Sequence, residues 1–347
     1  MPAIFTHHNT YCSYADLIMP QFFFAVGFAY RLAFLRRLQK GEGRWPAYRH
    51  AIGRCVGLFV IGFCIYHLDG GYSKWEELRQ LGFWGFLTTA FKTGIWQTLV
   101  HIAATSLWIL PVIAARPVAR VAFLVGTGLL HLALSHLFYY QWAMTEGAID
   151  GGPLGFMSWA IPTLVGSLTY DLMASDEARK TLKPLLTWSV VLMVLGYGIS
   201  CLNAVHHTLA GTAEAHGLKA WLVEPPFVAP SRPVDIWTMS QKAGSISYLT
   251  FSAGASLLIY VLFVRLAARK PCARRSDIGS FQVGLLRTLG GNALAAYIIS
   301  SWLEEAIHPF VPGNAPLWYV MSAFALFLGL TWLSVRYLEK NNLYLRL

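Results

Sequence analysis

The sequence has few charged residues for its length. Of its 347 residues, 13% are Asp, Glu, Lys or Arg and 56% are hydrophobic, whereas about 25% of a typical globular protein is charged. So few polar side chains cannot cover the surface of a water-soluble chain of this size. The composition therefore excludes a disordered chain and an ordinary cytosolic enzyme, and it favours a protein whose surface faces lipid.

Cysteine is also scarce, and its spacing follows no known pattern. The five cysteines are Cys12, Cys55, Cys64, Cys201 and Cys272. Their number is odd and their spacing is not that of metal ligands, so we predict neither a disulfide framework nor a cysteine zinc site. The histidines contain no His-x-x-x-His pair, so we predict no metal cofactor, although ligands from separate elements remain an alternative. Residues 1–10 lack the apolar core of a cleavable signal peptide.

Long hydrophobic stretches are abundant. A helix needs roughly 20 mostly apolar residues to cross the hydrocarbon core of a bilayer. Nine stretches meet this requirement: 14–35, 51–68, 95–115, 118–142, 152–174, 181–203, 244–268, 284–306 and 317–338. Because lipid offers no hydrogen bonds to the backbone, these stretches are predicted to be helices. The predicted fold is an all-α polytopic membrane bundle of about nine transmembrane helices, with one domain (1–347) and an extracytoplasmic cap at 204–243.

The basic residues alternate between the loops of this bundle. The formal charge is +10, and the loops after the first, third, fifth, seventh and ninth stretches hold most of the Lys and Arg. The other side keeps only Lys74, Arg79, Lys92, Lys219, Arg232 and Lys242. Because cytoplasmic loops are enriched in Lys and Arg, this pattern predicts an N-terminus outside and a C-terminus in the cytoplasm of a bacterial-type inner membrane. The same pattern accounts for the positive charge, so we predict no nucleic acid partner.

Histidines gather on the predicted outer side. Only His50 belongs to the basic side; the outer loops, outer helix ends and the middle of the bundle hold His7, His8, His67, His101, His131, His136, His206, His207, His216 and His308. A single histidine is usually a satisfied core or interface residue. The shared bias, however, favours an outward-facing pocket in which imidazole serves as a base, a nucleophile or a ligand.

Asp16 lies near the outer end of the first stretch, in Tyr14-Ala15-Asp16-Leu17-Ile18-Met19-Pro20. An ionisable group at this depth is costly and marks a functional site by default. We expect Asp16 to orient His7 or His8, as a carboxylate orients an imidazole in acyl transfer. The alternative is that Asp16 is an N-terminal helix cap. Pro20 cannot donate a backbone hydrogen bond to the carbonyl of Asp16, so a kink is also expected.

Polar residues in two other stretches are weaker candidates. Leu289-Gly290-Gly291-Asn292-Ala293-Leu294 interrupts the eighth stretch. The paired glycines permit either close packing or local unwinding, and the amide of Asn292 then needs a partner. Gln97 begins the third stretch. We therefore predict that substrate contacts are made by Asn9, Gln97, His101, His136 and Asn292.

These motifs resemble those of a known family. His8 followed by Ala15-Asp16-Leu17-Ile18-Met19-Pro20 and Phe22-Phe23-Phe24-Ala25-Val26-Gly27 resembles the first block of the heparan-α-glucosaminide N-acetyltransferase-like membrane acyltransferases. Gly152-Pro153-Leu154-Gly155 with Ile161-Pro162, and Gly291-Asn292-Ala293-Leu294 with Tyr297, resemble two later blocks. The histidines lie closer to Asp16 than in the family, Tyr11-Cys12-Ser13 replaces Trp-Asn-Gly, and the family's first helix has no counterpart.

The resemblance implies a multispan enzyme that takes acetyl from cytosolic acetyl-CoA and passes it across the bilayer to an amino sugar or other glycan acceptor. It also implies a histidine, here His8 or His7, as the base or transient acyl carrier, with Asp16 beside it. A homodimer is an open alternative to a monomer. Two rival functions are a proton-coupled small-molecule transporter, which would use Asp16, His101, His131 and His136, and a non-catalytic protein that binds glycan or lipid.

Overall fold

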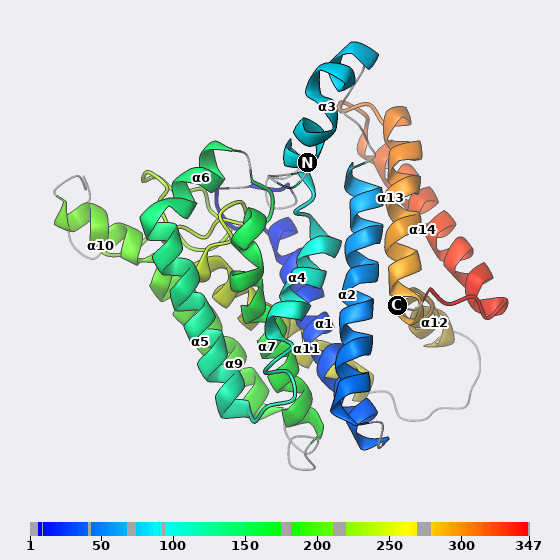
Figure 1. Ribbon diagram of the computed structural model, residues 1–347, viewed down its shortest axis with the longest axis horizontal. Helices are drawn as coiled ribbons and strands as arrows, with labels where there is room; N and C mark the ends of the chain where they lie inside the picture. Colours follow the sequence, from blue (N-terminus) through cyan, green and yellow to red (C-terminus); the bar gives the residue numbers. More distant parts are fainter. Residues whose placement is uncertain are drawn as a thin grey trace. The chain divides into compact units, whose positions relative to one another are not determined.

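The chain is built from helices, as the sequence predicts. The computed structural model describes residues 6–8, 10–40, 43–67, 74–89, 91, 94–146, 148–174, 182–210, 220–268 and 279–345, and these residues contain no strand (Figure 1). The chain divides into two compact units, Met1–Ala267 and Ala268–Leu347, which are described in turn. A single domain that spans 1–347 stays a prediction.

The first unit holds all the elements before α12. They are η2 (Ala15–Leu17), α1 (Ile18–Gln39), α2 (Arg44–His67), α3 (Trp75–Thr89), α4 (Thr98–Ile109), α5 (Pro117–Leu134), the π-helical η4 (Ser135–Tyr139), α6 (Tyr140–Thr145), η5 (Gly152–Leu154), α7 (Gly155–Ala174), α9 (Lys183–Ser200), α10 (Leu202–Leu209) and α11 (Ile246–Ala268). Pro117 and Pro184 stand in the first turns of their helices, where the missing N–H has no helical partner to lose.

Six helical segments of the described chain are long and apolar enough to cross a membrane. They are Ala15–Gln39, Arg44–Ile65, Pro117–Thr145, Lys183–Leu209, Ile246–Leu266 and Leu317–Lys340. The chain is therefore an apolar, membrane-type helical protein, but the nine predicted crossings are not confirmed.

The other three predicted crossings coincide with helices that are shorter or more polar. In the stretch 95–115 the helix α4 ends at Ile109 after 12 residues. The 20-residue α7 carries buried hydroxyl groups at Ser158, Thr163 and Ser167. The stretch 284–306 is divided at Asn292.

The core of the first unit forms where α7 packs against α1, α4 and α5 (Figure 1). The most extensive of these contacts joins α1 to α7, and two glycines make it possible. A Cβ at Gly27 would lie 1.8 Å from the carbonyl oxygen of Thr163, and one at Gly166 would lie 2.0 Å from that of Phe24. Small residues are common where membrane helices approach this closely. The two backbones therefore leave no room between them at this crossing.

An ionic cluster joins α1, α5 and α7 near one end of this contact. The Nε of Arg31 donates to Asp171 at 2.9 Å, and the guanidinium of Arg120 also donates to that carboxylate. Arg120 donates in addition to the Oγ of Ser167 at 2.9 Å. Both arginines are buried. Near the opposite end, Phe23 stacks on Trp159, so α1 and α7 run in the same direction.

The second unit contains α12 (Gly279–Gly291), α13 (Ala293–Ile307), η7 (His308–Phe310) and α14 (Leu317–Lys340). The break between α12 and α13 falls at Asn292, as predicted. The Nδ2 of Asn292 donates to the carbonyl of Leu343, and its Oδ1 accepts from the N–H of Leu345, both at 3.0 Å. Among the described residues, a Cβ at Gly290 or Gly291 would meet nothing within 4 Å. The local break predicted here is therefore present, at the residue that follows the two glycines.

The substitution Gly27→Ala should destabilise the first unit. Its methyl group must displace the backbone of α7, and overpacking of this kind costs about 1–3 kcal/mol. We expect a lower midpoint of thermal unfolding for the detergent-purified protein, followed by tryptophan fluorescence. Gly126→Ala in α5 is the matched control, because a Cβ there meets nothing within 4 Å and alanine favours helix. Equal shifts for the two variants would contradict the close contact.

The substitution Asp171→Asn should be more damaging, because it leaves two buried guanidinium groups without their counter-charge. Breaking a buried ion pair costs about 3 kcal/mol or more. The triple variant Arg31→Met/Arg120→Met/Asp171→Leu removes every charge of the cluster, and we expect it to recover most of the lost stability. The same thermal unfolding measurement tests both variants. A triple variant as unstable as the single one would show that the charges are not the cause.

Candidate functional site

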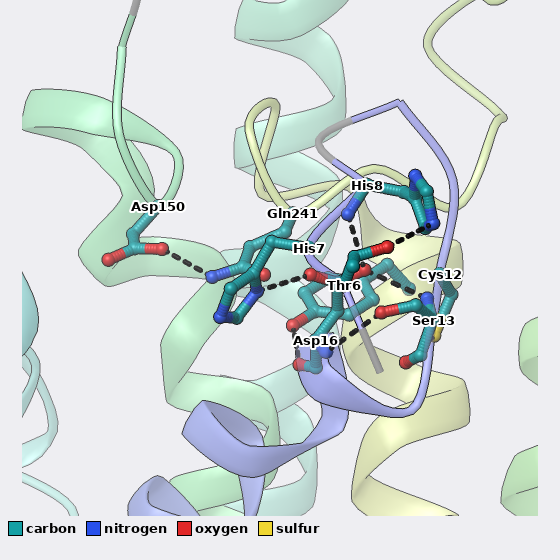
Figure 2. Close-up of polar contacts among 9 residues, drawn as sticks. Thr6, His7, His8, Cys12, Ser13, Asp16, Asp150 and Gln241 are labelled. Carbon is teal, nitrogen blue, oxygen red and sulfur yellow. Dashed lines mark hydrogen bonds and ion pairs between the residues drawn. The ribbon is translucent and has the colours of Figure 1, made fainter. Parts of the chain in front are cut away.

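His7, His8 and Asp16 lie where three segments of the first unit converge. These are the N-terminal segment before α1, the turn at residues 148–155 that leads into α7, and residues 220–245, which we call the cap segment (Figure 2). The cap segment is irregular and is held by hydrogen bonds to each of the other two. The N–H of Phe227 donates to the carbonyl of Cys12, and the N–H of Gly151 donates to that of Lys242, both at 3.1 Å. Residues far apart in the sequence thus form one cluster.

Asp16 lies at the centre of this cluster and has no exposed surface. Its Oδ2 accepts from the N–H of Ser13 at 2.8 Å, while the Oγ of Ser13 accepts from the N–H of Asp16 at 3.3 Å. Such reciprocal pairs are typical of helix N-termini, so the capping interpretation holds in part. The other oxygen, Oδ1, lies 2.8 Å from the Nδ1 of His7. Asp16 therefore both fixes the chain before α1 and orients an imidazole.

Pro20 leaves the carbonyl of Asp16 without its helical donor, and α11 supplies another. The hydroxyl of Tyr248, a fully buried residue of α11, donates to this carbonyl. A buried carbonyl without a partner is costly. Tyr248 therefore joins α11 to the start of α1 at the backbone of the residue whose side chain orients His7.

The two neighbouring histidines differ in position. The ring of His7 bonds to Asp16, and its side chain is 64% exposed. The ring of His8 stacks on Tyr11 at a centroid distance of 4.4 Å, and its Nε2 lies 2.9 Å from the Oγ1 of Thr6. The backbone N–H of His8 donates to the Oδ2 of Asp16 at 3.4 Å. Of the two candidates, the structure thus brings the imidazole of His7 to the carboxylate.

A second buried carboxylate, Asp150, lies on the other side of His7 (Figure 2). Its Oδ1 accepts from the Nε2 of Gln241 in the cap segment at 2.6 Å. Burial raises the pKa of Asp150 to about 6, and the negative charge of Asp16 adds to this, whereas Gln241 and His7 lower the pKa. The cluster therefore contains two carboxyl groups with an imidazole between them.

The turn that carries Asp150 has an unusual backbone. Asp150, Gly151 and Gly152 have φ values of 52°, 83° and 58°, a region that glycine enters without steric cost. The hydroxyl of Tyr139 accepts from the N–H of Leu154 at 2.8 Å and donates to the carbonyl of Gly151. Tyr139 thereby fixes the turn that begins the Gly152-Pro153-Leu154-Gly155 motif.

Two buried ring side chains, Trp159 and His101, pack against the turn that carries Asp150. Trp159 has no exposed surface, and its Nε1 donates to the carbonyl of Asp150 at 2.7 Å. His101 of α4 is also fully buried, and its ring centroid lies 6.3 Å from that of Trp159. A Cβ at Gly155 would lie 2.9 Å from the Cε1 of His101. His101 therefore packs against the turn at Gly155 and against Trp159.

A small pocket lies next to the cluster, between the N-terminal and cap segments. Tyr11, Cys12, Asn203, Pro226, Phe227 and Met239 are among its lining residues. Burial, with a smaller effect from Asp16, raises the pKa of the Cys12 thiol far above its ordinary value. Because thiolate is the reactive form, Cys12 is not a nucleophile here. The pocket has a volume of about 40 Å³, and its lining is mostly apolar, with polar side chains at Asn203, Glu224 and Thr238.

The other predicted contact residues do not join this cluster by any side-chain hydrogen bond found in the described residues. Gln97 occupies the N-cap position of α4, and its Nε2 donates to the carbonyl of Gly94 at 3.3 Å. His136 is exposed on η4. The amide of Asn292 bonds within the second unit. Asn9 lies outside the described residues. As substrate contacts these four stay predictions.

The sequence alone does not identify four residues of the cluster as site residues. They are Asp150, Gln241, Trp159 and Tyr248. One signal for Asp150 was present, because an acid directly before Gly-Gly-Pro at the start of an apolar stretch is unusual. The other three resemble ordinary interface or core residues. Only the fold brings them to Asp16 and Asp150.

Comparison with known proteins adds no family assignment. No protein-family model matches the chain, and no curated protein matches it significantly.

Asp150 should make stability depend on pH. Its pKa is about 6 in the folded state and about 3.9 in an unfolded chain. Between these values the folded state retains a proton that the unfolded state has released, so the contribution of Asp150 to stability is complete below pH 4 and is lost as the pH rises through 6. The total loss is on the order of 3 kcal/mol.

The variant Asp150→Asn should abolish this loss. We would measure the thermal unfolding midpoint between pH 4.5 and 7.5 for the parent protein, for Asp150→Asn and for Glu146→Gln. Glu146 is an exposed acid just before the same turn, so its variant should follow the parent. Parallel curves for the parent and Asp150→Asn would show that Asp150 does not titrate in this range.

Proposed function

We propose that the chain is a membrane acyltransferase that moves an acetyl group from acetyl-CoA to an amino sugar or other glycan acceptor. The observation that supports this most directly is the His7–Asp16 pair. A carboxylate without exposed surface holds the Nδ1 side of an imidazole that is itself 64% exposed. This is the arrangement in which a carboxylate orients a general base and stabilises its protonated form.

The proposed reaction needs one base. His7 takes the proton from the amine or hydroxyl of the acceptor as the nucleophile attacks the thioester carbonyl. The carbon–sulfur bond breaks, CoA leaves as a thiolate, and the proton on His7 passes to that sulfur. In a two-step variant, His7 first carries the acetyl group and then gives it to the acceptor. In both cases Asp16 stabilises the charged or acylated imidazole.

The surroundings of His7 suit a sugar acceptor. Asp150 and Gln241 offer a carboxyl group and an amide on the side of His7 opposite Asp16 (Figure 2). The adjacent pocket offers the rings of Tyr11 and Phe227. Sugars bind through hydrogen bonds at their edges and apolar contacts at their faces, so these groups are the proposed acceptor site.

The donor must reach His7 by a route other than the α1–α7 contact, because Gly27 and Gly166 bring those backbones together. An apolar groove lined by Trp96, Leu107, Trp108, Phe123 and Phe156 follows α4 and is the proposed route for the thioester arm. Basic loops at the cytoplasmic side would attract the CoA phosphates.

We propose this topology for a bacterial-type inner (plasma) membrane, with nine crossings, the N-terminus outside and the C-terminus in the cytoplasm. The shared direction of α1 and α7 agrees with this proposal, because they are its first and fifth crossings.

Acetyl transfer by the purified chain tests this function. With radiolabelled acetyl-CoA and glucosamine as the acceptor probe, His7→Ala and Asp16→Asn should each lower kcat/KM about 10²–10⁴-fold, since a positioned acid–base group contributes that much. His8→Ala is the matched control and should keep most of the activity. Label that stays on the protein without acceptor, and is lost in His7→Ala, would identify the two-step variant.

Full transfer by the double variant His7→Ala/His8→Ala would refute the assignment of the base. Binding of acetyl-CoA or sugar without any transfer would favour a non-catalytic binding protein. Uptake of solute into liposomes that depends on pH and not on CoA would favour a transporter. The first result excludes both histidines as the base, and the other two favour the rival functions over acetyl transfer.

A further inference from the structure

A second cluster of chemically active side chains lies outside the His7 site. His206 and His207 lie in the last turn of α10, and Asp235 belongs to the cap segment. One donor atom of each, a ring nitrogen or a carboxylate oxygen, lies within 4.8 Å of the other two. We propose that these three residues bind a divalent metal ion, Zn²⁺, and that the ion joins α10 to the cap segment. The proposal is independent of acyl transfer.

The carboxylate of Asp235 is held in position by its own turn. Its Oδ1 accepts from the N–H of Trp237 at 2.9 Å and from the Oγ1 of Thr238 at 3.3 Å. Metal ligands are commonly oriented by hydrogen bonds of this kind on the atom that does not bind the metal. The ligand oxygen of this site would be the other one, Oδ2.

The Oδ2 of Asp235 is the carboxylate oxygen that faces the histidines. It is buried and accepts no hydrogen bond from the described residues. The Nδ1 of His206 lies 3.7 Å away, which is too far for a hydrogen bond. A buried carboxylate oxygen without a partner is costly, and a cation between Oδ2 and the imidazole would remove that cost.

The rings of the two histidines lie close together beside Asp235. Their ring centroids are 5.4 Å apart and their planes are inclined by 62°. One turn earlier, the Nδ2 of Asn203 donates to the carbonyl of Pro233 at 3.0 Å and ties the cap segment to α10. The ligands therefore come from two elements that are already joined by a hydrogen bond, and their donor atoms lie within 4.8 Å of one another.

The donor set selects the metal. Two imidazole nitrogens and one carboxylate oxygen suit Zn²⁺, whereas Ca²⁺ and Mg²⁺ prefer sets made of oxygen alone. The side chain of His206 is 66% exposed, which leaves space for water as a fourth ligand. Three protein ligands and one water complete a four-coordinate zinc site.

Metal binding by the full chain in detergent tests the site. After removal of any polyhistidine tag and treatment with a chelator, we expect the protein to take up one equivalent of Zn²⁺ and to unfold at a higher temperature when loaded. Co²⁺ in place of Zn²⁺ should give the visible absorption of a four-coordinate site. Asp235→Asn keeps the acceptor at Oδ1 and removes the charged ligand, so its Zn²⁺ affinity should fall at least about tenfold.

The variant His206→Ala/His207→Ala should likewise lose the Co²⁺ spectrum, whereas His136→Ala, which removes an exposed histidine of η4, should keep it. Equal Zn²⁺ binding by the parent and all three variants would overturn the proposal. So would the absence of binding at micromolar Zn²⁺ combined with a stability that depends on pH, because that result identifies a simple His206–Asp235 ion pair.

Discussion

The close approach of α1 and α7 is the constraint on which the first unit depends. Where Gly27 and Gly166 let the backbones touch, the helices are fixed in both separation and direction. One end of the pair then brings Asp16 near the Asp150 turn, and the other end brings Arg31 to Asp171. Polar groups at both ends are thus positioned by an apolar contact between them. The position of Asp16, and of the His7 ring bonded to it, therefore depends on a packing contact made by two glycines.

Polar groups in this apolar chain find partners at long range. The carbonyl that Pro20 leaves unbonded receives the hydroxyl of Tyr248, which lies on a helix near the middle of the chain's second half. The amide of Asn292 pairs with the backbone beyond α14. Water cannot satisfy such groups in a low-dielectric interior, so each one requires a specific donor or acceptor. These requirements make the positions of α11 and of the C-terminal residues specific, which hydrophobic burial alone would not do.

Local chemistry in the sequence predicted some features and not others. The helical class, the break at Asn292 and the pairing of Asp16 with a histidine follow from apolar length, paired glycines and the cost of a charge near lipid. The sequence does not predict that His7, and not His8, pairs with Asp16. This depends on Tyr11 and Thr6, which contact the ring of His8. The hydrogen bond from Gln241 to Asp150 joins two segments that are far apart in the sequence. No pattern of apolar and polar residues predicts that these segments lie close together. The crossings expected at 95–115 and 152–174 stay predictions, because apolar content alone does not separate a short or buried helix from a lipid-facing one.

The π-helical segment η4 has a further consequence for the turn at Asp150. A π turn is equivalent to one extra residue in an α-helix, so it rotates everything that follows by about 100° around the helix axis. This rotation is what lets Tyr139 be buried against Gly151 while His136 stays exposed. A homologous chain one residue shorter between Ser135 and Tyr139 would have a regular helix there and would present a different side chain to Gly151. The number of residues in η4 therefore determines which side chain contacts the turn at Gly151.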